Sequence, residues 1–247
     1  MIKIVDLSRT FNGHAVLDGI NLEILQGEIT VIIGKSGVGK SVLLKHIIGL
    51  LKPDRGQIII DGQDITRARG AALKALKQRF AYLFQGGALF DSLPVFENVA
   101  FPLREKTKLP EAEIISRTKE RLAQVALSKE VENKYPDELS GGMKKRVALA
   151  RALIQEPEII LFDEPVTGLD PPMTNTVFHL ISKTHQESGY TALIVSHDIP
   201  EIFGIADHVA MLHKGRIIAY GSPEDIQRET NPVVQHFIQG EPDFLEE

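Results

Sequence analysis

The chain has 247 residues, a formal net charge of −5, 43% hydrophobic residues and 25% charged residues, which is an ordinary globular composition with enough length for a substantial core. The negative charge argues against a nucleic-acid scaffold, and the absence of cysteine excludes disulfides, thiolate metal sites and a cysteine nucleophile. No apolar run approaches the roughly 18 residues that span a bilayer, and the first residues lack a signal-peptide pattern, so we expect a cytoplasmic protein without its own membrane span.

Residues 1–60 predict mostly strand. Short apolar runs are punctuated by Gly and Asp, at 2–7, 20–25, 28–33 and 57–60. Asp61-Gly62 after the last run is typical of a tight turn.

Helical periodicity replaces this pattern at 93–155, with an amphipathic stretch at 111–126 and a helix at 140–154 that places Val147, Leu149, Ala150 and Leu153 on overlapping faces. Strand, helix and strand then follow at 158–163, 174–187 and 191–196, the rhythm of a parallel sheet. We therefore predict an α/β core with a mixed or parallel sheet at about 1–87 and 157–230, and an inserted helical subdomain at about 88–156. The tail, 231–247, predicts one short helix and a polar end at Asp243–Glu247.

The most informative stretch, Gly34–Ser41, lies between the apolar runs at 30–33 and 42–50. Its glycines let backbone N–H groups curl around phosphate oxygens, and the helix that follows directs its positive end at the anion. In this motif the lysine faces the β- and γ-phosphates and the final serine hydroxyl binds Mg²⁺. A Gly-rich turn that binds nothing is the alternative, and the strand, loop and helix order argues against it. ATP contacts are predicted at Gly34, Ser36, Gly37, Val38, Gly39, Lys40 and Ser41.

A second chemical signal is a pair of acids, Asp163 and Glu164, at the end of the apolar run 159–162. Such strand ends lie at the ligand crevice of a parallel sheet. We expect Asp163 to hold Mg²⁺ and Glu164 to polarise the attacking water. Two solvated acids at the start of a loop are the alternative, which the phosphate loop upstream disfavours.

Ser140, Gly141 and Gly142 follow Leu139 and open a predicted helix, so they present N–H donors and a hydroxyl to an anion. With the two motifs above, these residues resemble the ABC transporter ATPases, whose signature is Leu-Ser-Gly-Gly-Gln and whose nucleotide sites form between two protomers. Met143 stands where the family has glutamine, which removes an amide and one polar contact.

The resemblance extends over nearly the whole chain. It implies that Gln85 contacts Mg²⁺ and the attacking water and reports to a transport partner. It further implies that Asp170 links the two sites and that His197 contacts the γ-phosphate. Phe11 stands where family members stack an aromatic ring on adenine, although a core phenylalanine is the alternative. Four other histidines lack such placement and are predicted to be structural: His46, His185, His208 and His213.

The stretch 84–105 is more particular, and it resembles the ATPase of Mla-type, MCE-associated phospholipid transport complexes. Within it, 86–90 is a small, apolar patch suited to receive a helix from a partner, with an ordinary buried loop as the alternative. A basic cluster surrounds a predicted helix and comprises Arg67, Arg69, Lys74, Lys77 and Arg79. We interpret it as a solvated helix face, and binding of a lipid headgroup is the less favoured interpretation.

The sequence hypothesis is an ATP- and Mg²⁺-dependent motor, peripheral on the cytoplasmic face of the inner membrane. The resemblance implies a second copy of the chain in an ATP-sandwich dimer, integral-membrane permease subunits, a small STAS-domain protein and an MCE lipid-binding protein. Nucleic acid is not an expected partner. Two alternatives remain open: the ATPase of another ABC transporter, such as a solute importer or a lipoprotein-releasing system, and a soluble ABC-type assembly ATPase.

Overall fold

The computed structural model describes residues 1–240, and Asp243–Glu247 of the predicted polar end lies outside the described residues. The described chain forms two compact units. Unit 1 combines residues 1–77 with the chain from Thr191 on, and unit 2 is Gln78–Tyr190. These units divide the chain at other positions than the predicted core and helical subdomain, whose bounds stay a prediction.

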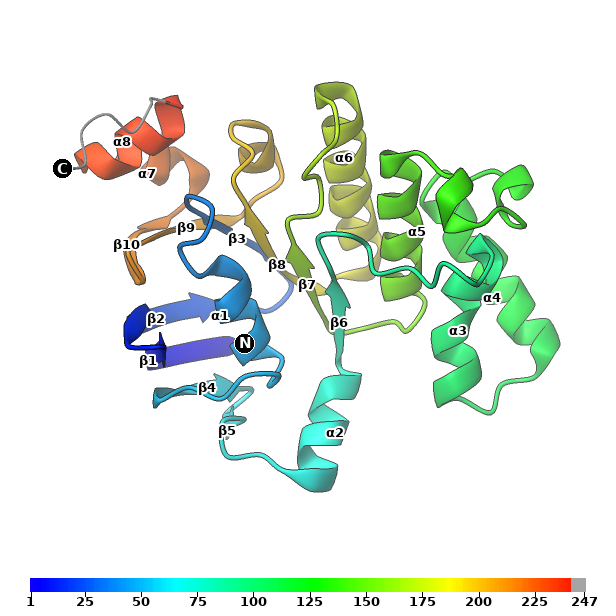
Figure 1. Cartoon of the computed structure of the whole chain (residues 1–247), viewed down its shortest axis with the longest axis horizontal. Coiled ribbons are helices and arrows are strands. Elements are labelled where there is room, and N and C mark those ends of the chain that lie inside the picture. Colours follow the sequence, from blue (N-terminus) through cyan, green and yellow to red (C-terminus); the bar gives the residue numbers. More distant parts are fainter. Residues whose placement is uncertain (241–247) are drawn as a thin grey trace. The chain divides into compact units, whose positions relative to one another are not determined.

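Unit 1 contains two groups of strands and several helices. A four-stranded antiparallel sheet has the order β2-β1-β4-β5, and a second group has the order β10-β9-β3-β8 (Figure 1). In the second group β3 runs parallel to β8 and β9, while β9 and β10 form an antiparallel pair. The elements of unit 1 are β1 (Ile2–Phe11), β2 (His14–Ile24), β3 (Ile29–Ile33), α1 (Lys40–Ile47), β4 (Arg55–Ile60), β5 (Gln63–Asp64), α2 (Gly70–Gln78), β8 (Thr191–Ser196), a 3₁₀ helix (Glu201–Gly204), β9 (His208–His213), β10 (Arg216–Gly221), α7 (Pro223–Arg228) and α8 (Pro232–Gln239).

The strands β3 and β8 are buried along their whole length, as expected for parallel strands without a solvent face. Their continuous apolar sequences predicted them at nearly the observed bounds. The predicted turn Asp61-Gly62 joins β4 to β5, with both residues at positive φ. The short helix predicted in the tail is α8.

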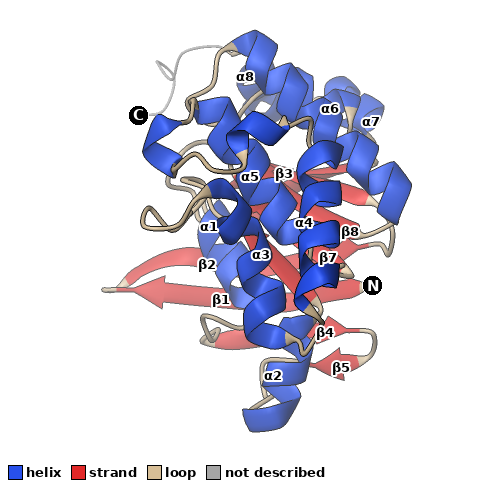
Figure 2. Cartoon of the chain, turned by 90° about the vertical axis from the view of Figure 1, so that its right-hand side faces the viewer, coloured by secondary structure: helices blue, strands red, loops and turns tan. Residues whose placement is uncertain are grey.

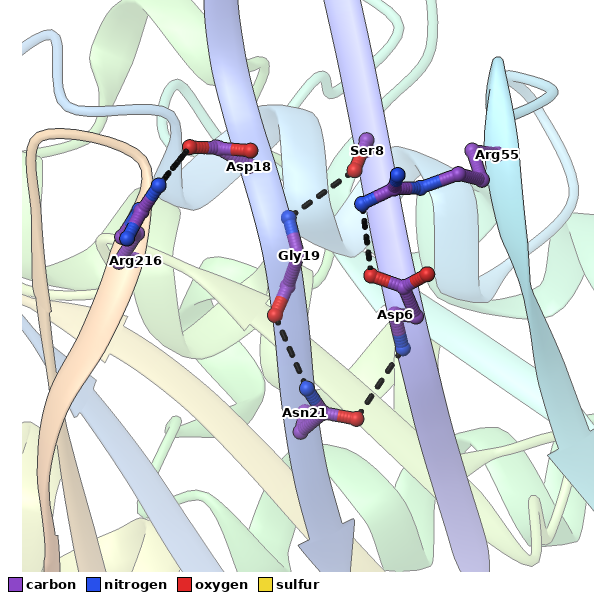
Figure 3. Close-up of polar contacts among 7 residues, drawn as sticks. All are labelled: Asp6, Ser8, Asp18, Gly19, Asn21, Arg55 and Arg216. Carbon is purple, nitrogen blue, oxygen red and sulfur yellow. Dashed lines mark hydrogen bonds and ion pairs between the residues drawn. The ribbon is translucent and has the colours of Figure 1, made fainter.

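β1 and β2 are longer than predicted, because polar residues in their outer halves break the alternation that marks a strand. These residues are joined by hydrogen bonds across the pair and within β2 (Figure 3). Asp6 N–H donates to the Asn21 Oδ1 at 3.1 Å, Asn21 Nδ2 donates to Gly19 O at 3.0 Å, and Gly19 N–H donates to Ser8 Oγ at 2.9 Å. Side chains therefore replace ladder bonds where the β1–β2 register shifts.

Unit 2 combines a parallel strand pair with helices. β6 pairs with β7, and α3, α4 and α5 pack against one another as the green helices of Figure 1, seen also in Figure 2. The predicted inner positions of α5, Val147, Leu149, Ala150 and Leu153, are all buried. The elements of unit 2 are β6 (Phe80–Leu83), α3 (Val95–Lys106), α4 (Glu111–Gln124), two 3₁₀ helices (Lys129–Val131 and Pro136–Glu138), α5 (Gly141–Leu153), β7 (Ile159–Asp163) and α6 (Pro171–Ser188).

These elements confirm the predicted α/β class with mixed strand directions. Among residues 1–240, no helix is both long and apolar enough to cross a membrane. The basic cluster needs one correction: Arg79 follows α2 and forms an ion pair with Glu158 at 2.7 Å, so it belongs to the packing of unit 2.

Three of the four histidines predicted to be structural make side-chain contacts within their own unit, and the fourth, His213, is placed as the last residue of β9. His46 is 1% exposed and its Nδ1 lies 2.8 Å from Val42 O, and burial lowers its pKa. His208 lies 2.8 Å from Glu28 and stacks on Tyr220. In unit 2, His185 packs edge-on against Tyr190.

Candidate nucleotide site

The predicted phosphate loop connects β3 to α1 in unit 1. α1 begins at Lys40, and its N-cap is Gly39, at φ 107°, so no capping side chain covers the first N–H groups of the helix. A Cβ at Gly39 would lie 3.0 Å from Val16 O and 3.1 Å from Val16 Cγ1, and one at Gly34 would lie 2.3 Å from Leu212 O. Glycine therefore lets the loop pack directly on β2 and β9.

Lys40 supplies the positive charge of this loop. Its side chain is buried, and Nζ donates to Gly34 O at 2.7 Å and to Lys35 O at 2.9 Å. The ammonium thus folds back over the loop that carries Ser36 and Val38, next to Ser41 in the first turn of α1. A helix N-terminus, a glycine cradle and a lysine form a donor set that fits a phosphate group.

Two further predicted ligands lie in unit 1. His197 is exposed and directly follows β8, where Ser196 Oγ and Asp198 hold the turn through bonds of 3.0 Å in both directions. Phe11 ends β1 and is half-buried. The Arg9 guanidinium lies 4.6 Å from the centre of its ring. Contacts of His197 and Phe11 with a nucleotide stay predictions.

The acid pair lies in unit 2, at the end of β7. Asp163 is its last residue and is 7% exposed. Tyr82 on the neighbouring strand β6 donates its hydroxyl to Asp163 Oδ2 at 2.7 Å. Burial, and then the bond to Asp163, raise the pKa of Tyr82, so the phenol stays protonated and fixes the carboxylate. Sequence reasoning missed Tyr82; the signal was a hydroxyl in an otherwise apolar strand.

Glu164 has a positive φ of 49°, which is uncommon for a residue with a side chain. Its Oε2 accepts two hydrogen bonds of 3.0 Å, from Gln85 Nε2 and from Thr167 Oγ1. The structure therefore brings together Gln85 and Glu164, which the sequence predicted separately. The contact of Thr167 with this acid could not be predicted from the spacing of residues in the sequence.

The signature-like residues lie at the start of α5. Ser140 caps this helix, with its Oγ accepting from Met143 N–H at 3.3 Å. A Cβ at Gly142 would lie 2.4 Å from Met173 Cγ and Sδ, and one at Gly141 would lie 3.2 Å from Leu169. Both glycines thus let the start of α5 approach the start of α6.

Asp170 lies on the other side of this contact. It caps α6, and its Oδ1 accepts from Met173 N–H at 2.9 Å. Met173 therefore joins the Asp170 cap to Gly142 within unit 2. Roles for Ser140, Gly141, Gly142 and Asp170 toward a second protomer stay predictions.

The loop after β6 is exposed at its aromatic residues, since Phe84 and Phe90 are each 41% exposed. This contradicts the alternative of an ordinary buried loop. Arg151 on α5 donates to Gly87 O at 2.6 Å and to Ala88 O at 2.9 Å, so the backbone of the patch is fixed from inside.

The described residues 1–240 contain no group of three His, Asp or Glu side chains that could hold a metal ion on its own. The available oxygen donors are the Ser41 hydroxyl, the Gln85 amide and the Asp163 carboxylate. Mg²⁺ is commonly held by one or two carboxylates together with substrate phosphates, and Asp163 of unit 2 is a carboxylate suited to that mode; the ligand roles of Ser41, Gln85 and Asp163 stay predictions.

Comparison with known proteins identifies the family. The ABC transporter family model matches residues 17–167. The chain is 41% identical to "Intermembrane phospholipid transport system ATP-binding protein MlaF" of Escherichia coli K12, over 97% of this chain and 89% of the relative. It is 43% identical to "Probable ribonucleotide transport ATP-binding protein mkl" of Mycobacterium bovis, over 97% of this chain and 66% of the relative.

Solved structures agree with these sequence matches. The dimeric post-hydrolysis structure of the ATP-binding cassette MJ0796 bound to ADP and Pi has a TM-score of 0.83 at 31% identity, covering 90% of this chain and 99% of that one. The structure of cbiO1 from Clostridium perfringens, part of the ABC transporter complex cbiONQ, has a TM-score of 0.84 at 34% identity, with coverages of 95% and 93%. The chain therefore belongs to the ABC transporter family of nucleotide-binding ATPases.

Proposed function

We propose that the chain is the ATP-hydrolysing motor subunit of an ABC transporter that moves phospholipid between membranes. The observation that supports phospholipid as the cargo is the identity of 41% over 97% of the chain to a protein named for intermembrane phospholipid transport. The observed phosphate loop and the paired acids supply the chemistry that such a motor needs.

The loop of unit 1 binds the phosphates of ATP. Its backbone N–H groups and the Lys40 ammonium surround the anion, and the Lys40 bonds to Gly34 O and Lys35 O give way to phosphate oxygens when ATP arrives. Phe11 stacks its ring on adenine.

Hydrolysis uses the acids of unit 2. Glu164 accepts hydrogen bonds from neutral donors in the present structure, and as the general base it accepts one from the attacking water instead. Gln85 orients the same water through its amide, and His197 donates to the γ-phosphate. Mg²⁺, held by Ser41, Gln85 and Asp163, supplies neutralisation of phosphate charge when bound.

The active form is a dimer of two such chains. Ser140 and Gly142 of one copy complete the phosphate site of the other through the start of α5, where N–H donors and the helix dipole favour an anion. Support comes from the solved relative of the same fold, whose structure is dimeric.

Membrane partners complete the motor. The exposed loop with Phe84 and Phe90 receives a helix of a permease subunit, at the cytoplasmic face of the inner membrane. An MCE lipid-binding protein and a small STAS-domain protein belong to the same assembly, which the resemblance of 84–105 supports.

The test is recovery of the tagged chain from native membranes, with mass spectrometry of its companions and ATPase assays of the recovered complex. We expect a permease and an MCE protein in the wild-type sample. Glu164→Gln should lower hydrolysis at least about a hundredfold while ATP binding persists, as expected for loss of a general base. Lys40→Ala should lose ATP binding as well. Unchanged hydrolysis in Glu164→Gln would contradict the assigned base.

A second candidate is an ABC motor for another cargo, because a relative at 43% identity is named for ribonucleotide transport. The same pull-down separates the two, since a permease without lipid-binding partners favours another cargo. Recovery with soluble scaffold proteins alone favours an assembly ATPase.

A further inference from the structure

Lys145 is 7% exposed, although it lies in the basic run Lys144-Lys145-Arg146 of α5. It projects from the second turn of α5 and its Nζ donates to the backbone carbonyl of Gln85 and, at 3.3 Å, to that of Glu164. One buried ammonium thus contacts both loops that carry the proposed water-activating residues.

Burying an ammonium is costly unless hydrogen bonds replace its hydration. Bonds from a charged donor are also stronger than neutral ones. Here the acceptors are carbonyls of two loops that follow different strands, β6 and β7. The ammonium therefore fixes the backbone from which the Gln85 and Glu164 side chains project toward each other, 3.0 Å apart.

The same helix begins at Ser140, Gly141 and Gly142, so Lys145 is within two turns of the signature-like residues. Arg151, further along α5, holds the next carbonyls of the Gln85 loop, at Gly87 and Ala88. Lys145 and Arg151 of α5 together hold the backbone of this loop, at Gln85, Gly87 and Ala88.

We propose that Lys145 is a positioning residue for hydrolysis, which ties the Gln85 and Glu164 loops to the signature helix α5 so that the three segments move as one body. This inference rests on the proposed function, because it concerns the same reaction. Movement of the signature helix on dimer closure is then transmitted directly to the residues that orient the attacking water.

The test compares the wild-type complex recovered from membranes with Lys145→Met, which keeps the length of the side chain and removes its donors. Lys144→Met is the matched control, because the neighbouring lysine lies on the same turn but is half-exposed. Lys145→Arg restores a charged donor. Each variant is assayed for kcat, for KM for ATP, and for hydrogen–deuterium exchange of the peptide spanning 84–90, whose Gly87 N–H donates to Phe84 O.

For Lys145→Met we expect kcat to fall about tenfold or more, in keeping with loss of a charged hydrogen bond, while KM for ATP changes less than about twofold. Exchange at 84–90 should accelerate by about tenfold as well. Lys145→Arg should recover most of both effects, and Lys144→Met should match the wild type. If Lys145→Met does not fold, Lys145→Gln, which keeps a shorter neutral donor, takes its place.

Normal kcat in Lys145→Met, normal exchange at 84–90, or an equal loss in Lys144→Met would overturn the positioning role. Failure of the proposed function is distinguishable, because it appears as a wild-type complex that does not hydrolyse ATP. In that case the exchange measurement still decides whether Lys145 fixes the loop.

Discussion

The phosphate loop of unit 1 and the acid cluster of unit 2 are built in different ways. The loop consists of backbone N–H groups, placed by glycines where a side chain would meet Val16 or Leu212. The acid cluster consists of side chains that hold one another, with Tyr82 on Asp163 and with Gln85 and Thr167 on Glu164.

This difference decides how each region responds to substitution. Where the loop packs on β2 and β9 it has no spare room, so a methyl group added at Gly34 or Gly39 displaces the loop. A side-chain network loses one bond at a time, and the remaining donors keep the acid near its position. A single substitution in the phosphate loop should therefore cause a large loss of function, whereas a substitution in the acid cluster should cause a loss that depends on the number of bonds it removes. We call the first region brittle and the second graded.

The largest effect is expected from Gly39→Ala. The new Cβ lies 3.0 Å from Val16 O, and the backbone there has φ 107°, which disfavours a residue with a side chain. The loop therefore shifts, and restoring its position reduces the free energy of ATP binding. Strain and overpacking together amount to about 3 kcal/mol, which predicts ATP affinity lowered by roughly a hundredfold in a titration of the purified chain.

Gly37→Ala is the matched control, since Gly37 has φ 82° but nothing within 4 Å of its added Cβ. It bears only the backbone cost of about 1–2 kcal/mol, which predicts roughly a tenfold loss of affinity. Equal losses in the two variants would show that packing on β2 does not make the loop brittle.

The same difference explains what the sequence could predict. Glycine spacing between two apolar runs indicates backbone geometry directly, so the loop predicted after the first run is observed, at residues 34–39, and α1 follows it from Lys40. The bonds of Tyr82 and Lys145 join residues far apart in the chain and depend on the parallel register of β6 and β7, which no local pattern indicates. The ends of β1 and β2 escaped prediction for a related reason, because side chains there replace regular alternation.

Gly142→Ala extends the comparison to the start of α5, where glycine again replaces a side chain. The Cβ would meet Met173 Cγ and Sδ at 2.4 Å, and overpacking predicts a loss of about 1–3 kcal/mol in the free energy of unfolding. Met173→Ala in the same chain should recover much of this loss, because it removes the opposing side chain. Urea unfolding of the single and double variants measures the coupling, and purely additive losses would contradict the contact.

Tyr82→Phe probes the side-chain network through pH. The folded state raises the pKa of Tyr82 above its ordinary value of 10.0, so the folded protein keeps a proton that the unfolded chain loses. Its contribution to stability is complete below pH 10 and declines above it, by up to about 1.4 kcal/mol per pH unit. Tyr82→Phe should lose about 1 kcal/mol at pH 8 and show a shallower decline above pH 10.

Thermal unfolding at several pH values checks this prediction. Tyr135→Phe serves as the control, because Tyr135 is 45% exposed. If both variants follow the wild-type curve above pH 10, burial of Tyr82 and its bond to Asp163 do not keep the phenol protonated.

The smallest effect is expected from Thr167→Val, which preserves shape and removes one of two donors to Glu164 Oε2. Because Gln85 still donates to the same oxygen, we expect kcat to fall only about threefold to tenfold, which is less than the full value of one hydrogen bond to a charged group. Thr176→Val is the matched control, since the Thr176 hydroxyl donates to Pro172 O within α6 and does not touch the acids. A loss of kcat as large as that of Glu164→Gln would mean that Thr167 alone places the carboxylate. The acid cluster would then be as brittle as the phosphate loop, and the contrast between the two regions would fail.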